Sequence, residues 1–341
     1  MSEQDNLQRN IQGKQLTDLG DNKAWGYITK FGLAAIIIVL LVLPNYVGNY
    51  FQFVISLWAV TAIAAQGLNL MMGYAGLVSL AQGAFMGIGA YASTLMIKNW
   101  GLNFWAAMIL AILLCVIIGA LIGFPALRVE GHYLAFVTLG FNELVVLILR
   151  NEDQWTGGPL GLLNIERPSI FGYSLFEATR FYYFSLLMLA ISSLLVWYMI
   201  RSPWGRAFKA LKDNPNRAES LGMNITSYTL LAFAIGSGLA GFAGTLIAPL
   251  VEFVEPNQFQ LLKSLEYLLM VMVGGRGFLA GPLIGAFASE VVPEWLRFAD
   301  EYYLIFFAIF VMLSIRFFPE GVAGFGKQIR RRFFSERKEA A

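Results

Sequence analysis

The sequence predicts an all-α protein that crosses a membrane about ten times. Hydrophobic residues make up 57% of the 341 residues and charged residues only 13%, about half the charged share of a typical soluble domain. The apolar residues fall in runs of nearly bilayer length, which a soluble core does not absorb. Because lipid offers the backbone no hydrogen-bond partner, each run is expected to form a helix.

The expected spans follow one another along the chain, and some cross only part of the bilayer. The eighth and ninth are short against the ~20 residues needed to cross. They flank the glycine-rich residues 274–277, so half-helices or strong tilt are expected there. The predicted spans are 30–43, 50–72, 77–97, 104–124, 132–149, 181–200, 227–250, 264–273, 279–292 and 302–315.

Charge predicts the orientation of these spans. If residues 201–222 are cytoplasmic, ten spans place both termini in the cytoplasm and most of the 24 lysines and arginines on that side. The N-terminal residues 1–29 then form a cytosolic tail rather than a signal peptide. Residues 30–320 form the transmembrane domain, and residues 321–341 form a basic cytosolic tail facing solvent or lipid headgroups.

The docking segment, as we call residues 201–222, is the one long polar and basic stretch between apolar runs. Asn214 is a suitable helix cap, Pro215 suits the first helical position and Gly222 is a natural stop, so a two-turn helix is expected over 214–221. Arg206 and Arg217 would then present charge to another cytoplasmic protein. The alternative is an ordinary basic loop of the kind found on the inner side of most membrane proteins.

Glycines interrupt the apolar pattern between the second and third spans. Gly73 and Gly76 surround Tyr74 at a span end, which favours a helix break. Such a break is tolerated in a membrane only where protein or a water-filled path covers it, and Ser79 and Gln82 would then face that path. Close helix packing is the alternative for this stretch, and it is the expected role of the glycines in the seventh span. Residues 274–287 weakly repeat the glycine pattern of residues 73–85.

Glu143 is the clearest ionisable residue inside a span. It follows Thr138 and Asn142, which are expected to form one polar stripe with the last turn before Arg150. Such groups are costly in lipid and usually functional. A proton-coupled carrier would need this carboxylate, and a structural hydrogen bond to a neighbouring helix is the other interpretation. Glu266 and Glu290 lie near predicted span ends and are expected to be solvated.

Other chemistry is not predicted. The single cysteine, Cys115, excludes an internal disulfide, and the lone His132 has no metal-ligand neighbour in helical register, so no metal is expected. No Walker-type glycine loop and no catalytic carboxylate pair occur, so the chain is not expected to be an enzyme or to hold a cofactor. A net charge of +2 gives no reason to expect nucleic acid.

Several segments together carry a resemblance. The chain resembles the LivM-type permease subunits of bacterial branched-chain amino acid ABC importers over about residues 50–320. The segments that carry it are GYAGLVSLAQGAFMGIGAYAS (73–93), GHYLAFVTLGFNEL (131–144), TGGPLGL (156–162), GRAFKALKDNPNRAESLGMN (205–224) and EPNQFQLLKSLEYLLMVMVGGRGFLAGPLIGA (255–286).

The resemblance implies an all-helical ABC permease in the bacterial inner membrane, multi-pass, that imports branched-chain amino acids. It also implies four partners: a homologous LivH-type permease, two cytoplasmic ATPases that hydrolyse ATP, and a periplasmic amino-acid-binding protein. A urea or amide permease, another amino-acid permease, a secondary carrier using Glu143 and a non-conducting scaffold remain alternatives. The candidate path residues are Gly73, Tyr74, Gly76, Ser79, Gln82, Thr138, Asn142 and Glu143, and the candidate ATPase-coupling residues are Gly205, Arg206, Ala210, Asp213, Asn214, Arg217, Ala218, Leu221 and Gly222.

Overall fold

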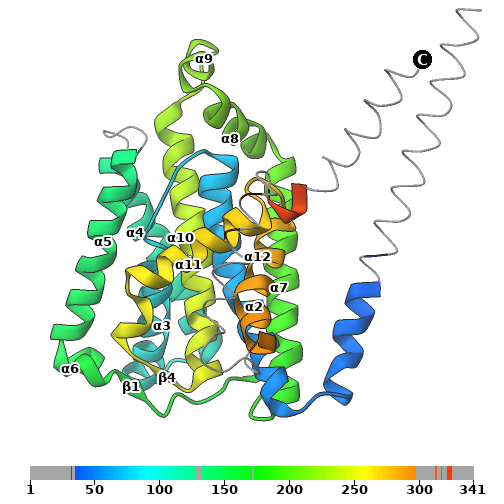
Figure 1. Cartoon of the computed structure of the whole chain (residues 1–341). Coiled ribbons are helices and arrows are strands. Elements are labelled where there is room, and N and C mark those ends of the chain that lie inside the picture. Colours follow the sequence, from blue (N-terminus) through cyan, green and yellow to red (C-terminus); the bar gives the residue numbers. More distant parts are fainter. Residues whose placement is uncertain are drawn as a thin grey trace, which may run out of the picture. The chain divides into compact units, whose positions relative to one another are not determined.

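The computed structural model describes residue 32 and residues 35–126, 132–170, 173–296, 312, 316 and 321–324 (Figure 1). The chain forms two compact units, Met1–Gln52 and Phe53–Ala341. Three predicted segments lie wholly or almost wholly outside the described residues: the N-terminal tail, the tenth span and the C-terminal tail.

In the first unit, a short apolar helix ends in a 3₁₀ turn. Helical residues 35–42 lead into η1 (Leu43–Asn45), which covers the described part of the predicted first span. The side-chain amide of Gln52 donates to the carbonyl oxygens of Pro44 at 3.1 Å and Val47 at 3.2 Å. The first residues of α2 (Asn49–Leu68) are thereby tied to this turn.

Two helices form the centre of the second unit. In α2 and its π-helical continuation η2 (Asn69–Tyr74), 89% of the most apolar window is buried, and in α10 (Ile225–Val251) the figure is 78%. Both helices are apolar on all sides, as expected for helices surrounded by protein. Figure 1 shows α5 and α7 on opposite sides of the core that contains α3 and α10.

Glycines allow α10 to pack closely on its neighbours α3 (Gln82–Trp100) and α4 (Phe104–Ala126). A Cβ atom added at Gly241 would collide with the sulfur of Cys115 on α4, and one added at Gly89 would collide with the backbone of Gly241. The predicted packing role of the glycines in the seventh span is therefore confirmed.

The outer helices expose their apolar faces. Only about a third of the most apolar window is buried in α5 (His132–Asn151) and α7 (Ala178–Arg201). Among the described residues, five helices are long and apolar enough to cross a membrane: Asn49–Tyr74, Phe104–Phe124, Tyr133–Asn151, Ala178–Arg201 and Ile225–Val251. They match the predicted second, fourth, fifth, sixth and seventh spans, which confirms the all-α polytopic fold.

The predicted eighth and ninth spans form a pair of shorter helices. They are α11 (Leu261–Gly274) and α12 (Gly281–Leu296), of 14 and 16 residues. At 1.5 Å per residue they rise about 21 and 24 Å, which is less than the ~30 Å hydrocarbon core. The two helices pack on each other, and the 3₁₀ turn η6 (Val322–Gly324) contacts both.

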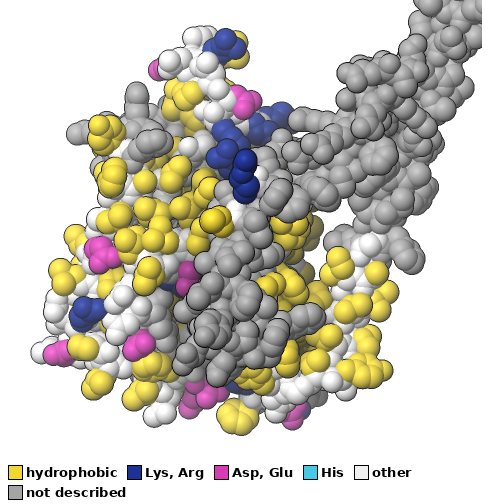
Figure 2. Space-filling view, viewed as in Figure 1, with side chains coloured by type: hydrophobic (Ala, Val, Ile, Leu, Met, Phe, Trp, Pro, Cys, Tyr) yellow, Lys and Arg dark blue, Asp and Glu magenta, His cyan; other side chains and the backbone are white. Residues whose placement is uncertain are grey.

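Short elements close the two ends of the helical unit. One end carries α8 (Pro203–Asp213) and α9 (Pro215–Ser220). The other end carries α6 (Asp153–Thr156), η3 (Gly158–Leu160), η4 (Pro256–Phe259) and two antiparallel strand pairs, β1 (Leu162–Leu163) with β4 (Phe253–Val254) and β2 (Ser169–Ile170) with β3 (Tyr173–Ser174). Figure 2 shows Lys and Arg gathered near α8 and α9, hydrophobic side chains over the middle, and more of the visible Asp and Glu toward the other end.

Candidate functional site

The predicted break after α2 is present. The helix widens into the π turn η2, and the chain is non-helical from Ala75 until α3 begins at Gln82. Gly76 has a φ of +77°, a left-handed conformation that glycine adopts without steric cost. The amides of Ala75 and Leu77 end the turn by donating to the carbonyls of Leu70 and Met71. The prediction of a helix break at Gly73 and Gly76 is confirmed.

A second break separates α11 from α12, and it lies against the first. Asn69 joins them: its Nδ2 donates to the carbonyl of Phe278 at 2.9 Å, and its Oδ1 accepts from the amide of Gly277 at 2.8 Å. A Cβ atom added at Gly73 would lie 2.5 Å from the nitrogen of Gly277. The two glycine-rich segments that resemble each other in sequence are therefore in contact, and each covers non-helical backbone of the other.

Two predicted path residues hold the start of α3. Thr138 and Asn142 lie on the inward face of α5 and are fully buried. The Thr138 hydroxyl accepts from the amide of Leu80 at 2.9 Å, and the Asn142 Oδ1 accepts from the amide of Ala84 at 2.9 Å. The first amides of a helix have no partner inside it, so these side chains provide caps from a neighbouring helix.

Ser264 on α11 completes this polar network. Its hydroxyl accepts from the amide of Gly83 at 2.8 Å and donates to the Oδ1 of Asn142 at 3.0 Å. Asn142 in turn donates to the carbonyl of Phe259 at 3.3 Å. Asn142 thus connects α3, α5, α11 and η4, and sequence alone gave no reason to include Ser264.

The other polar candidates also point into the subunit. Ser79 and Gln82 are fully buried. The Gln82 amide donates to the carbonyl of Ala64 at 2.6 Å, and the Ser79 hydroxyl accepts from the amide of Ala81 at 3.3 Å. In this structure neither side chain reaches the surface of the subunit, so their predicted contact with a path stays untested.

Glu143 differs from these residues because its side chain faces outward. It lies eight residues before the end of α5, about 12 Å along the helix axis. Among the described residues, no hydrogen bond or ion pair to its carboxylate is present. An unpaired acidic side chain near the centre of a span costs about 3 kcal/mol in lipid. This face of α5 is therefore expected to meet protein or water rather than lipid.

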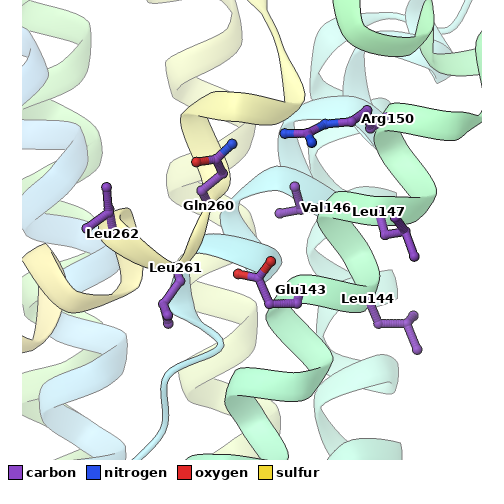
Figure 3. A pocket seen from close by; sticks show the side chains of 8 residues that line it. All are labelled: Glu143, Leu144, Val146, Leu147, Arg150, Gln260, Leu261 and Leu262. Atoms are coloured by element: carbon purple, nitrogen blue, oxygen red, sulfur yellow. The ribbon is translucent and has the colours of Figure 1, made fainter.

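A hollow of about 490 Å³ lies beside Glu143, between α5 and the start of α11. In Figure 3 the carboxylate points away from α5 toward Leu261, and the side chain of Arg150 extends over the same space near Gln260. The guanidinium of Arg150 donates to the Oδ1 of Asn257 at 2.8 Å. The remaining lining is aliphatic: Leu144, Val146, Leu147 and Leu262. The hollow thus combines an apolar wall with one carboxylate, one guanidinium and one amide.

The docking segment contains the predicted helix and a longer one that was not predicted. Asn214 caps α9 by accepting from the amide of Arg217 at 3.0 Å, and Gly222 has a φ of +82° just after the helix. The helix expected over 214–221 is confirmed. The additional helix α8 is capped by Ser202, whose hydroxyl accepts from the amide of Trp204 at 3.2 Å.

The predicted coupling residues divide into buried and exposed groups. Gly205 and Ala218 are buried, and a Cβ atom at Gly205 would collide with the backbone of Ile200. Leu221 is 84% exposed at the end of α9, an apolar side chain in a polar segment. Ala210 and Asn214 are half-buried, and Arg206, Asp213, Arg217 and Gly222 are exposed.

Three charged residues form a network that the sequence did not predict. Lys263 on α11 pairs with Glu266 at 2.7 Å and with Glu290 on α12 at 3.6 Å. The expectation that Glu290 is solvated is wrong, because its side chain is only 13% exposed. Glu266, at 47%, remains partly exposed. The pairing ties α11 to α12 near one end of the two helices.

At the end of the unit opposite the docking segment, a strand pair and an ion pair join two loops. We call these residues, 162–163, 167 and 252–254, the rim. Leu162 and Leu163 pair with Val254 and Phe253 across β1 and β4. Arg167 forms an ion pair with Glu252 at 3.0 Å. These contacts hold the connection between α5 and α7 to the end of α10. The described residues include no group of three or more His, Cys, Asp or Glu side chains that could hold a metal ion.

Comparison with known proteins gives matches over most of the chain. The family described as branched-chain amino acid transport system / permease component matches residues 50–315. The chain is 33% identical over 316 residues to the high-affinity branched-chain amino acid transport system permease protein LivM of Salmonella typhimurium, and 32% identical over 316 residues to the protein of that name in Escherichia coli. Each match covers 86% of this chain and 74% of the relative.

A relative with a different printed role matches less closely. The autoinducer 2 import system permease protein LsrC of Escherichia coli is 25% identical over 272 residues, which cover 76% of this chain and 74% of that protein. No solved structure matches the chain significantly.

Proposed function

Because the chain belongs to the family of branched-chain amino acid transport system permease components, we propose that it is one permease subunit of an ATP-driven importer of branched-chain, hydrophobic amino acids. The higher identity to the two LivM proteins than to the autoinducer 2 permease supports this substrate class. The aliphatic wall of the hollow beside Glu143 suits such side chains.

The observation that carries the proposal is the exposed apolar tip of the docking segment. Leu221 is 84% exposed and lies next to the basic residue Arg217 on a capped helix. An exposed apolar side chain surrounded by charged residues is typical of a protein-binding surface. The proposed partners are two cytoplasmic ATPase subunits, which hydrolyse ATP while this chain has no enzymatic role. Arg206 and Asp213 extend this surface along α8.

The translocation path lies on the face that carries Glu143, between this chain and a homologous LivH-type permease. The unpaired carboxylate supports this placement, because a lipid-facing position would be costly. Gly73, Tyr74 and Gly76 form the broken backbone of the path wall. Thr138, Asn142, Ser79 and Gln82 hold that wall in place from inside the subunit, because their side chains bond to backbone groups.

The subunit lies in a bacterial inner membrane with both termini and the docking segment in the cytoplasm. The gathering of Lys and Arg around α8 and α9 supports this orientation (Figure 2). Residues 30–320 form the transmembrane domain between two cytosolic tails, and the rim faces a periplasmic amino-acid-binding protein. A cysteine placed at position 214 should react with a membrane-impermeant label only from the cytoplasmic side.

Reconstitution tests the function. The chain is co-expressed with a LivH-type permease and ATPase subunits from the same organism, isolated through a tag on this chain, and placed in proteoliposomes with the binding protein. Co-isolation of the ATPases and ATP-dependent leucine uptake are expected. Omitting ATP, or replacing leucine by urea, serves as the control.

Two results would contradict the proposal. Leucine uptake by this chain alone, driven by a proton gradient, would identify a secondary carrier. Uptake of urea or an amide in preference to leucine by the complete complex would keep the importer class but overturn the substrate.

A further inference from the structure

One lysine of the docking segment reaches the helix break. The ammonium of Lys212, in the last turn of α8, donates to the carbonyl oxygen of Gly73 at 2.7 Å. Its stem packs on the same break, because a Cβ atom added at Gly76 would lie 3.2 Å from the Cγ of Lys212 and 3.3 Å from its Cα. A single side chain therefore joins two segments that lie 139 residues apart.

The acceptor explains why a lysine lies here. Gly73 lies in the last turn of η2, where helix carbonyls have no donor in the next turn. A basic group at a helix C-terminus satisfies such carbonyls and interacts favourably with the helix dipole. A hydrogen bond from an ammonium is also stronger than one between neutral groups. Lys212 thus caps the end of the α2–η2 helix from another part of the chain.

Packing under Lys212 joins α8 rigidly to the break. Phe208 and Leu211 are buried on the inner face of α8 and belong to one cluster with Leu70, Tyr74 and Ala75. Leu70 and Tyr74 lie in η2, and Ala75 directly follows it. A displacement of α8 must therefore move the break or open this cluster, because close-packed interiors transmit strain.

The second break is within reach of the same side chain. A Cβ atom added at Gly277 would lie 3.7 Å from the Nζ of Lys212, and Gly277 is held to Asn69 by its amide. Arg276 next to Gly277 is close enough to disfavour the charged form of Lys212. Lys212 therefore lies where the docking segment meets both breaks.

We infer that Lys212 is the positioning residue that transmits movement of the docking segment to the two glycine breaks. The inference rests on the proposed function, in which ATPases bind α8 and α9. When the ATPases displace α8, the hydrogen bond from Lys212 pulls the backbone at Gly73 in the same direction. The hydrogen bonds of Asn69 transmit this displacement to Gly277. The two breaks then move together at the path wall.

The test compares substrate transported per ATP hydrolysed in the complete reconstituted importer. Lys212→Met keeps the stem and removes the donor, so the complex should assemble and hydrolyse ATP while transport per ATP falls about tenfold, as expected for a lost charge-assisted hydrogen bond. Lys212→Arg restores a donor and should return the ratio to within about threefold of the wild type. Lys98→Met, which removes a lysine that donates to the backbone carbonyl of Leu163 at the opposite end of the unit, should leave the ratio unchanged.

The outcomes separate this inference from the function itself. An unchanged ratio in Lys212→Met overturns the inference while the importer stands. Failure of the wild-type complex to couple ATP hydrolysis to uptake contradicts the proposed function instead. If Lys212→Met does not assemble, Lys212→Gln is measured by the same ratio, because its side chain stays polar but is too short to reach the Gly73 carbonyl. A wild-type ratio in that variant also overturns the inference.

Discussion

Asn69 holds Gly277 through a hydrogen bond of 2.8 Å, and this bond joins the two interruptions of the helical bundle. The other end of the same amide donates to Phe278. One side chain therefore satisfies two backbone groups of a segment 208 residues away. Non-helical backbone inside an apolar bundle needs such partners.

Replacing Asn69 should show how much this contact contributes. Asn69→Leu removes the side-chain partner of the partly buried Gly277 amide and Phe278 carbonyl, at a cost of about 1–3 kcal/mol for each bond. The variant should unfold at a lower temperature in detergent and lose uptake. Asn103→Leu removes one exposed helix cap and should cost about 1 kcal/mol with normal uptake. Equal effects of the two substitutions would contradict a special role for Asn69.

Gly76→Leu should impair uptake without preventing insertion. Its φ of +77° strains any other residue, and its Cβ would press on Lys212. Gly101→Leu is a matched control, because Gly101 has a φ of +64° but nothing within 4 Å of the added atom. The left-handed backbone alone should cost each variant about 1–2 kcal/mol of stability, and the contact with Lys212 adds to the loss only in Gly76→Leu. Only Gly76→Leu should lower the rate of uptake measured in proteoliposomes.

Glu143→Leu should change stability and transport in opposite directions. Removing an unpaired carboxylate from a span should stabilise the isolated subunit, by up to about 3 kcal/mol. Uptake by the complete importer should fall about tenfold, and Glu143→Gln should show whether charge alone is responsible. The control Glu152→Gln removes an exposed carboxylate near the end of α5. A loss of subunit stability in Glu143→Leu would instead indicate a structural hydrogen bond.

Leu221→Asp should release the ATPases from the permease. A desolvated apolar anchor typically contributes 2 kcal/mol or more to binding, so affinity should fall about thirtyfold. The measurement is the amount of ATPase that co-purifies. Leu163→Asp replaces a leucine that is 58% exposed at the opposite end and should have no effect on it. Ala218→Trp is less informative, because Ala218 is 2% exposed and packs within the segment.

Stability should depend on pH through Lys212. Burial lowers the pKa of Lys212 below its ordinary 10.5, and Arg276 adds to this effect while Asp213 opposes it. Between its lowered pKa and 10.5, the folded chain binds fewer protons here than the unfolded chain, so rising pH favours the fold. The stability of the wild type relative to Lys212→Met should therefore increase from pH 7 to pH 10 in thermal unfolding. A constant difference would contradict the lowered pKa.

Features that depend on neighbouring residues were predictable from the sequence. The cap at Asn214, the stop at Gly222 and the break at Gly76 each follow from the backbone conformation that their residue type favours. The long spans were predictable because lipid requires apolar runs of a fixed length. Only α8 was missed among the helices of the docking segment, because its few apolar positions sit among basic residues.

Features that depend on distant partners were not predictable. Thr138 and Asn142 share the inward face of α5 and bind the start of α3, whereas Glu143 faces outward. Periodicity identifies a polar face and cannot say what packs on it. Glu290 was expected in water because it lies near a predicted span end. Its ion pair with Lys263 joins two different helices, so the sequence does not reveal it.

The rim formed by the β1–β4 pair and the Arg167–Glu252 ion pair has a kinetic consequence. A loop that folds only on contact loses conformational entropy at that moment, and this loss weakens the encounter. Here residues 162–167 of the connection from α5 to α7 are already held to the end of α10. The proposed binding protein would therefore meet a surface that is already ordered, and its association rate should be governed by diffusion and charge rather than by loop ordering.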